Sequence, residues 1–374
     1  MEMQKRNNFK SKIKNIASHP YFGYLLAGFI FLVLLLLYEA GIVKISTFRA
    51  AGQTIIYFII ALGFTLLLGY SGLASLGTAG FIGLGTYAVG SSLALLNVPV
   101  IVAFAIAVVV AVVIGGVVGF ISLRIEGMYL AIITLGLSEI LNEVFKNATK
   151  ITNGVNGLQI SRPKLLGFIT ANNNVVFAIL IIMMVVAMII TANIINSPTG
   201  RAMLSMKNST SAAQAMGISL LKYRLLAFVL ATIYAVLGGG LYMLFYRFSI
   251  PTTWNLALSL NILAAVVVGG AKSIWGVFLG TFLIFGFDLA ILRKIPLFIK
   301  FPNATLLING ALIIIIVMFY PGGLIELIRN LYYKIKLKKD KATLKARRKR
   351  YGLETETTQN QEEYINQQRQ KITR

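Results

Sequence analysis

The chain has 374 residues, of which 57% are hydrophobic and 13% are charged, and it carries a formal net charge of +23. Its mean hydropathy of +0.80 lies far from the balance of a soluble domain. The composition therefore excludes an ordinary soluble enzyme and indicates a polytopic helical membrane protein. Cysteine is absent and His19 is the only histidine, so disulfides and metal sites built on these side chains are excluded as well.

Ten mostly apolar stretches are candidates to cross the roughly 30 Å of hydrocarbon in a bilayer, which takes about 20 helical residues. They cover residues 24–38, 50–69, 75–95, 98–123, 128–145, 175–195, 225–245, 256–270, 274–289 and 303–320. The first follows basic residues but precedes no convincing cleavage site, so we interpret it as a retained anchor. The sequence thus predicts an all-α fold with about ten transmembrane helices. It divides into a basic N-terminal segment (1–23), a membrane domain (24–323) and a basic, then polar tail (324–374).

Both ends of the chain are strongly basic. Five lysines or arginines lie at residues 5–14, and eleven lie at residues 329–350 against one aspartate. Basic flanks favour the cytoplasm, so both termini are predicted cytoplasmic. A basic tail beside a membrane is attracted to anionic lipid headgroups by about 1 kcal/mol per residue. We therefore assign the positive charge to topology and lipid contact, not to nucleic acid, and predict that the polar end, residues 353–374, is disordered or a loose surface helix.

One polar segment interrupts the apolar chain at residues 196–224, which read NSPTGRAMLSMKNSTSAAQAMGISLLKYR. We call it the polar island. A membrane protein keeps such a segment outside the bilayer so that a soluble partner can touch it. In the ten-span topology the island is cytoplasmic, whereas residues 146–174 lie on the other side.

Two glycine patterns resemble nucleotide-binding loops but fail on their spacing. A P-loop needs glycines where this chain has Val266 and Ala271, and the loose dinucleotide fingerprint at 83–88 lies inside a predicted span without a following acid. We interpret both as helix packing. The glycines four residues apart at 115–119 and 276–280 have the same meaning, because small residues let helix backbones meet in lipid.

The stretch 69–85 is less ordinary, because six glycines accompany Ser71, Ser75 and Thr78 at the expected turn between the second and third spans. Irregular backbone at membrane depth survives only where protein or a watery cavity satisfies its polar groups. Two interpretations remain open: a plain tight turn between helices, or part of a translocation path. For the second, the candidate lining residues are Gly72, Ser75, Gly77 and Thr78.

Several segments together resemble a known family. They are GYSGLASLGTAGFIGLGTYAVG from Gly69, LRIEGMYLAIITLGLSEI at 123–140, TNGVNGL at 152–158, GRAMLSMKNSTSAAQAMGISLLKYRLLAF at 200–228, VVVGGAKSIWGVFLGTFL from Val266, and MFYPGGL from Met318. In this order they resemble the permease subunits of branched-chain amino acid ABC transporters, over roughly residues 50–325. The resemblance is to the longer of the two permease types in such systems.

The resemblance implies a cell-membrane importer core that pairs with a homologous permease. Two separate cytoplasmic ATPases would dock beneath, and an extracytoplasmic binding protein would deliver the substrate. No cofactor and no catalytic group are implied. A short helix at 209–216 would then sit in a groove of the ATPase; the alternative is a solvated connector. The residues assigned to this coupling are Gly200, Arg201, Ala212, Ala213, Ala215 and Gly217.

Two positions complicate the resemblance. The family usually carries His where this chain has Thr78, which leaves the substrate open between branched-chain amino acids and the urea or small amides of related permeases. Glu139 and Glu143 lie four apart on one helix face, and intramembrane carboxylates are costly. Glu139 is a further candidate for the path, although a structural pair or a contact with the sister permease explains it equally well.

A different class, the ion-coupled secondary transporter, would need acidic or polar ligands near the midplane. Only Glu139, Glu143 and Asp288 qualify loosely, which disfavours it. A membrane enzyme is disfavoured further, because no pair of nucleophile and base is visible.

Overall fold

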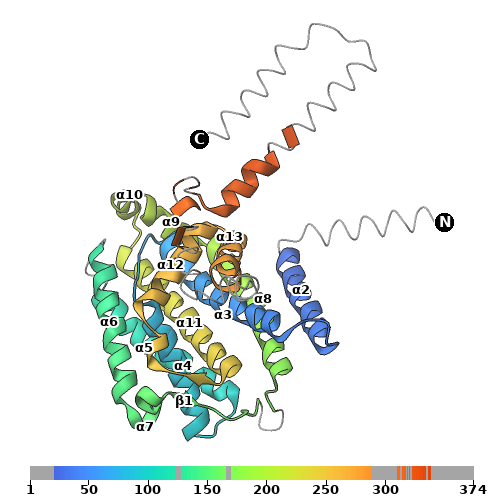
Figure 1. Ribbon diagram of the computed structural model, residues 1–374. Helices are drawn as coiled ribbons and strands as arrows, with labels where there is room; N and C mark the ends of the chain where they lie inside the picture. Colours follow the sequence, from blue (N-terminus) through green and yellow to red (C-terminus); the bar gives the residue numbers. More distant parts are fainter. Residues whose placement is uncertain are drawn as a thin grey trace, which may run out of the picture.

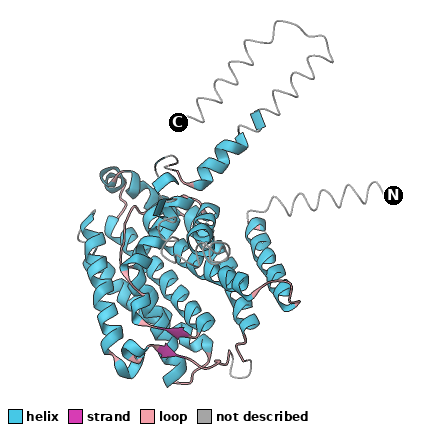
Figure 2. Cartoon of the chain, in the orientation of Figure 1, coloured by secondary structure: helices cyan, strands magenta, loops and turns pink. Residues whose placement is uncertain are grey.

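The computed structural model describes residues 21–122, 128–165 and 170–287, and parts of 310–337. Helices make up almost all of the described chain (Figure 2). The long helices are α2 (Phe22–Glu39), α3 (Ile45–Phe64), α4 (Thr78–Leu95), α5 (Val100–Ser122), α6 (Met128–Asn147), α8 (Asn173–Asn196), α11 (Leu220–Tyr246) and α12 (Leu256–Gly269). The shorter α-helices are α7 (Thr149–Thr152), α9 (Pro198–Asn208), α10 (Thr210–Ala215) and α13 (Ile274–Thr281).

Irregular helices and one small sheet complete the fold. The π-helices η1 (Thr65–Tyr70) and η4 (Phe282–Gly286) continue α3 and α13, and η2 (Gly154–Asn156) and η3 (Pro251–Thr253) are single 3₁₀ turns. Strands β1 (Leu158–Gln159) and β2 (Phe248–Ser249) pair antiparallel, with Leu158 opposite Ser249 and Gln159 opposite Phe248. This pairing ties the loop after α6 to the end of α11.

Seven helical segments of the described chain are long and apolar enough to cross a membrane. Helix α6 has 20 residues and carries the two glutamates, and the α13 and η4 segment is a shorter apolar helix. Nine of the ten predicted spans therefore correspond to helices. The tenth, 303–320, lies largely outside the described residues, as do residues 1–20 and most of the tail. The prediction of an all-α polytopic membrane fold is confirmed.

Three predicted boundaries are wrong by a few residues. Helices α3 and α11 begin five residues early, at Ile45 and Leu220, because basic and polar residues are tolerated where a helix leaves the hydrocarbon. Helix α4 begins three residues late, at Thr78, because residues 71–77 form a non-helical turn in which Gly72 has a positive φ of 74°.

The two ends of the bundle differ (Figure 1). Helices α9 and α10, both in the polar island, lie at one end, which we call the island end. Strand β1 and helix α7 lie at the other, which we call the strand end. The segment 146–174 and the island therefore occupy opposite ends, as the ten-span topology requires.

Helix α11 packs against α3, α4 and α5. Glycines make this packing close: a Cβ at Gly85 of α4 would lie 2.1 Å from the carbonyl oxygen of Val236, and one at Gly239 of α11 would lie 2.0 Å from that of Ile82. The Thr86 hydroxyl donates to the Gly239 carbonyl at 3.0 Å. Direct backbone contact of this kind is how helices associate in lipid.

The glycine pairs predicted to serve helix packing do so. A Cβ at Gly115 or Gly119 of α5 would meet Thr232 or Leu225 and Phe228 of α11. A Cβ at Gly276 would lie 2.3 Å from the Gly269 carbonyl oxygen in α12. The P-loop look-alike is the turn between α12 and α13, where Ser273 caps α13 by accepting a bond from the Gly276 amide at 3.2 Å.

Candidate translocation site and coupling segment

The polar island folds as two short helices with ordinary caps. Ser197 caps α9 by accepting from the Gly200 amide at 3.3 Å, and Ser209 caps α10 by accepting from the Ala212 amide at 3.2 Å. Gly217 ends α10 with a φ of 78°, a conformation that glycine adopts without strain. The structure therefore has a helix at the predicted place, although its six residues are fewer than the predicted 209–216.

The predicted coupling residues divide between two faces. Ala212, Ala215 and Gly217 are exposed, as is Met216 at 68%. Ala213 is fully buried within the chain, so it holds α10 in place and offers no surface to a partner. Gly200 is also buried, because a Cβ there would lie 2.4 Å from the Ile194 carbonyl oxygen. Arg201 is exposed and donates to the Asn196 carbonyl at 3.2 Å.

Lys207, which the sequence analysis did not single out, links the island to the membrane helices. Its ammonium group donates to the carbonyl oxygens of Leu68 at 3.1 Å and Gly69 at 2.8 Å. Both carbonyls belong to the last turn of η1, where a cation complements the helix dipole. Partial burial, and then the nearby Lys272, lower the pKa of Lys207. No distinctive sequence signal marks it, because α9 also carries Arg201 and several polar residues.

The glycine-rich turn between η1 and α4 is held from several sides. Gly72 lies beside the Lys207 side chain: a Cβ at Gly72 would lie 3.1 Å from Lys207 Cγ. A Cβ at Gly77 would lie 2.4 Å from the Thr134 carbonyl oxygen of α6. Gly72 thus serves the turn and Gly77 serves the contact with α6. Neither residue lines the small cavity formed by α3, α4 and α11.

The first turn of α4 gets its hydrogen bonds from two neighbouring helices. The Ala79 amide donates to Ser259 Oγ of α12 at 2.9 Å, and the Gly80 amide donates to Ser138 Oγ of α6 at 3.0 Å. The first amides of a helix have no partner within the helix, so these two hydroxyls satisfy donors that would otherwise be buried unpaired. Thr78, the first residue of α4, is thereby fixed in position.

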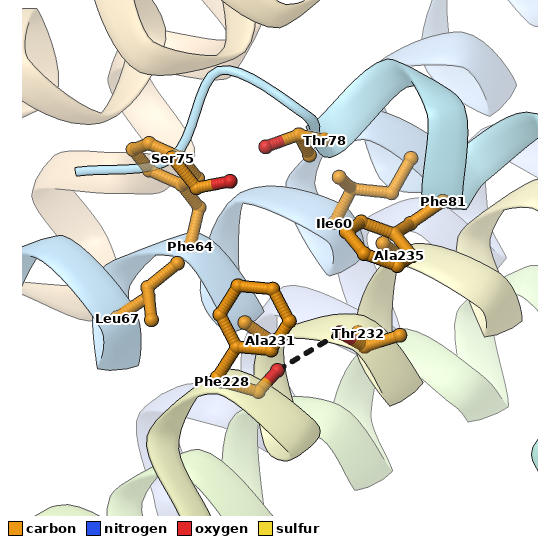
Figure 3. A pocket seen from close by; sticks show the side chains of 10 residues that line it. All are labelled: Ile60, Phe64, Leu67, Ser75, Thr78, Phe81, Phe228, Ala231, Thr232 and Ala235. Carbon is orange, nitrogen blue, oxygen red and sulfur yellow. Dashed lines mark hydrogen bonds between the residues drawn. The ribbon is translucent and has the colours of Figure 1, made fainter. Parts of the chain in front are cut away.

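Ser75 and Thr78 line a small cavity between α3, α4 and α11 (Figure 3). Its volume is about 20 Å³, which holds a water molecule but lies far below the several hundred Å³ of a ligand pocket. Most of the lining is apolar and was not predicted from the sequence. The apolar lining residues are Ile60, Phe64, Leu67, Phe81, Phe228, Ala231 and Ala235.

Glu139 lies apart from this cavity. It is exposed on α6, on the same side as Ile132 and Ile140, each 62% exposed. Glu143 is also exposed and pairs with Lys146 at 2.7 Å, not with Glu139. The structure therefore brings together two of the five predicted path residues, Ser75 and Thr78. Among the described residues no group of three or more His, Cys, Asp or Glu side chains is placed to hold a metal ion.

A bundle of apolar helices around a small internal cavity, with a folded polar segment at one end, is the architecture of a membrane transport permease. Comparison with known proteins identifies the family to which this permease belongs. The family model described as "Branched-chain amino acid transport system / permease component" matches residues 46–317. The chain belongs to this family, and it is a permease subunit of an ABC importer.

Two curated relatives carry the name high-affinity branched-chain amino acid transport system permease protein LivM. The protein of Escherichia coli (strain K12) is 30% identical over 331 residues, covering 80% of this chain and 75% of the relative. That of Salmonella typhimurium (strain LT2) is 30% identical over 320 residues, covering 78% and 72%. No solved structure matches the chain. The family predicted from the six segments is confirmed, and it is a family of transport components rather than enzymes.

Proposed function

We propose that this chain forms the translocation path for branched-chain amino acids, and that ATP hydrolysis on separate cytoplasmic subunits opens it through α10, α9 and Lys207. The observation that carries the proposal is the pair of bonds from Lys207 to the end of η1. These bonds join the island, a polar segment with an exposed helix, to the helix whose Leu67 lines the cavity.

The surface for the ATPase is the exposed side of α10. Ala212 and Ala215 are small, and Met216 is a flexible apolar side chain, so a groove could close around this side without clashes. Buried Ala213 would pass a displacement of α10 to the rest of the island, because packed side chains move together. Both ATPases and the binding protein are implied by the family resemblance.

Movement of α9 would reach the cavity over a short distance. Lys207 contacts the last turn of η1 and lies beside Gly72 in the turn that leads to Ser75 and Thr78. A shift of α9 would therefore act at once on η1 and on the turn before α4, both of which contribute residues to the cavity lining. The cavity of about 20 Å³ is too small for an amino acid, so substrate passage requires such a shift.

The lining of the cavity favours an apolar substrate side chain. Three phenylalanines and aliphatic residues surround it, whereas Ser75 and Thr78 supply hydroxyls at one edge. An amino acid with a branched aliphatic side chain matches this division, and urea, which has no apolar part, does not. The names of the two relatives agree with this choice.

The homologous permease would cover α6. Glu139 is 11 residues from the first residue of α6, about 16 Å along the axis and thus near the middle of the hydrocarbon. A carboxylate facing lipid there costs about 2.5 to 3.5 kcal/mol, so protein is expected to face it. Gly136, one turn away, has no atom within 4 Å of a Cβ and leaves room for a close approach.

The whole assignment is tested by transport in proteoliposomes that contain the chain, its sister permease, both ATPases and the binding protein. We expect uptake of labelled leucine that requires ATP and persists after proton and sodium gradients are collapsed. Urea should not compete. Gradient-driven uptake without ATP would identify a secondary transporter, and ATP-driven uptake of urea in place of leucine would reject the substrate.

The route through Lys207 is tested in the same system with Lys207→Met, which keeps an apolar side chain of similar length but removes the donor. We expect ATP hydrolysis to continue while uptake falls about tenfold, since two bonds to a charged group are lost. Lys222→Met, an exposed lysine at the start of α11, is the control and should transport normally. Equal uptake by the two variants would reject this route.

A further inference from the structure

A second and larger cavity lies away from the translocation site, where α3 and α8 begin and α11 ends. Its volume is about 370 Å³, which is within the range of ligand pockets. Arg49 on α3, Asn173 at the start of α8 and Arg247 after α11 contribute its polar lining, and Phe48 and Phe245 contribute its apolar lining. We call it the arginine pocket. Its residues belong to none of the segments assigned to coupling or to the path.

Arg247 is held rigidly at the rim of the pocket. It adopts a positive φ of 58° directly after α11. One terminal nitrogen, Nη2, donates to Asn173 Oδ1 at 2.6 Å and to the Ala171 carbonyl at 3.4 Å. Its Nε is buried and has no hydrogen-bond partner within the described structure. The Arg247 guanidinium lines the pocket, and its donors are not all used by these two bonds, so it can also bind an oxyanion.

The side chains that line the pocket carry positive charge and no negative charge. Arg49 is exposed and forms no ion pair within the described residues, and no carboxylate lines the pocket. Glu39, on the neighbouring α2, is engaged by Asn174 Nδ2 at 2.7 Å. Burial, and then the nearby Arg162, lower the pKa of Arg247. Arg162 adds a further positive charge in the neighbourhood rather than a negative one.

The position of the pocket favours a lipid. It lies at the level where membrane helices begin and end, which is the depth of lipid headgroups. Its floor is aromatic: Phe48 stacks on Tyr38 and on Phe177, with ring centroids 4.1 and 4.4 Å apart. Helix α2, which supplies Tyr38, has only 11% of its residues buried, so most of this helix faces the bilayer. The arginines of the pocket match the phosphate of a lipid headgroup, and the aromatic side chains beneath them match the acyl chains.

We infer that the arginine pocket binds the phosphate of an anionic membrane lipid, with the guanidinium groups of Arg49 and Arg247 as its donors. Two charged donors on one phosphate give charge-assisted bonds, and the apolar floor takes the first part of the acyl chains. Inorganic phosphate shares the headgroup chemistry but lacks the chains. A bound lipid would hold α3, α8 and α11 together at this end of the bundle.

The test uses the full-length chain, purified with its partner subunits in detergent and then supplied with phosphatidylglycerol or phosphatidylcholine. Lipid retention is measured by native mass spectrometry, and stability by the melting temperature. We expect preferential retention of phosphatidylglycerol and a higher melting temperature with it. Arg49→Gln should weaken retention about tenfold, which is the loss of one charge-assisted bond. Arg247→Lys, which keeps the charge but loses the guanidinium donors, should weaken it similarly.

Lys150→Gln is the matched control, because Lys150 is an exposed cation of the strand end outside the pocket. It should retain phosphatidylglycerol as the unmodified chain does. Equal retention of the two lipids, or the same retention by Arg49→Gln and Lys150→Gln, would overturn the inference. Stabilisation by inorganic phosphate equal to that by phosphatidylglycerol would also overturn it, because the site would then bind a free anion.

Discussion

Helices α4 and α5 pack against each other but have opposite relations to their surroundings. In its most apolar window α4 has a mean hydropathy of 1.2 and 78% of its residues buried, whereas α5 has a mean hydropathy of 3.1 and 28% buried. The more hydrophobic helix is therefore the more exposed one. In a soluble protein the order would be reversed.

The reason is that lipid tails are as apolar as leucine, so hydrophobicity alone does not drive a helix inward. Helix α4 is buried because its glycines let backbones touch and its hydroxyls find partners, as Thr86 does on α11. Helix α5 presents bulky aliphatic side chains such as Val109, 62% exposed, to its surroundings. Fit between backbones, rather than apolar area, selects the inner helices.

The largest difference in stability is expected when a glycine of α4 and a glycine of α5 are each replaced by leucine. Gly85→Leu should destabilise the bundle by about 3 kcal/mol or more, because its Cβ would meet the Val236 backbone and neither helix can yield. Gly116→Leu on α5, where nothing lies within 4 Å, should be tolerated. Thermal stability of the two purified variants measures the difference. If the two lose stability equally, the proposed division between inner and outer helices is wrong.

A second substitution concerns the turn that precedes α4. Gly77→Leu should cost about 1 to 3 kcal/mol and lower the yield of assembled complex, because its Cβ would press on the Thr134 carbonyl of α6. Yield of detergent-stable complex and uptake are compared in one preparation. Full assembly with abolished uptake would show instead that Gly77 lines the path, the role that the sequence suggested.

The sequence predicts elements here better than it predicts their faces. Nine spans and the island helix are visible in the order of apolar and polar segments, since span length follows from bilayer thickness. Which side of a helix packs against its neighbours has no such signal. Ala213 and Glu139 show this: the first, assigned to ATPase coupling, is buried, and the second, for which the path was one of several candidate roles, is exposed. Both facings depend on neighbouring helices that local sequence does not specify.

The outer helices should respond to changes that affect pairing rather than folding. Glu139→Leu is expected to change the free energy of unfolding of the isolated chain by no more than about 0.5 kcal/mol, as substitutions at exposed sites usually do. The melting temperature of the isolated chain should therefore hardly change. Co-purification of the sister permease should fall several-fold, because the group that faces Glu139 on the sister permease would lose the carboxylate as its partner. Glu143→Gln, whose parent side chain already pairs with Lys146, is the control. Undiminished pairing in Glu139→Leu would exclude α6 from the interface.

The smallest expected effect lies at the cavity, where an inner helix contributes chemistry as well as packing. Thr78→Val preserves shape and removes one hydroxyl from the cavity edge. If that hydroxyl contacts the passing amino acid, KM for transport should rise about two- to tenfold while assembly and ATP hydrolysis stay unchanged, which is the value of one neutral hydrogen bond. Thr232→Val is the control: Thr232 lines the same cavity, but its hydroxyl already donates to the Phe228 carbonyl at 2.9 Å. A KM shift for Thr78→Val alone would therefore assign substrate contact to the start of α4, whereas equal shifts in the two variants would mean that the cavity responds to any change in its lining.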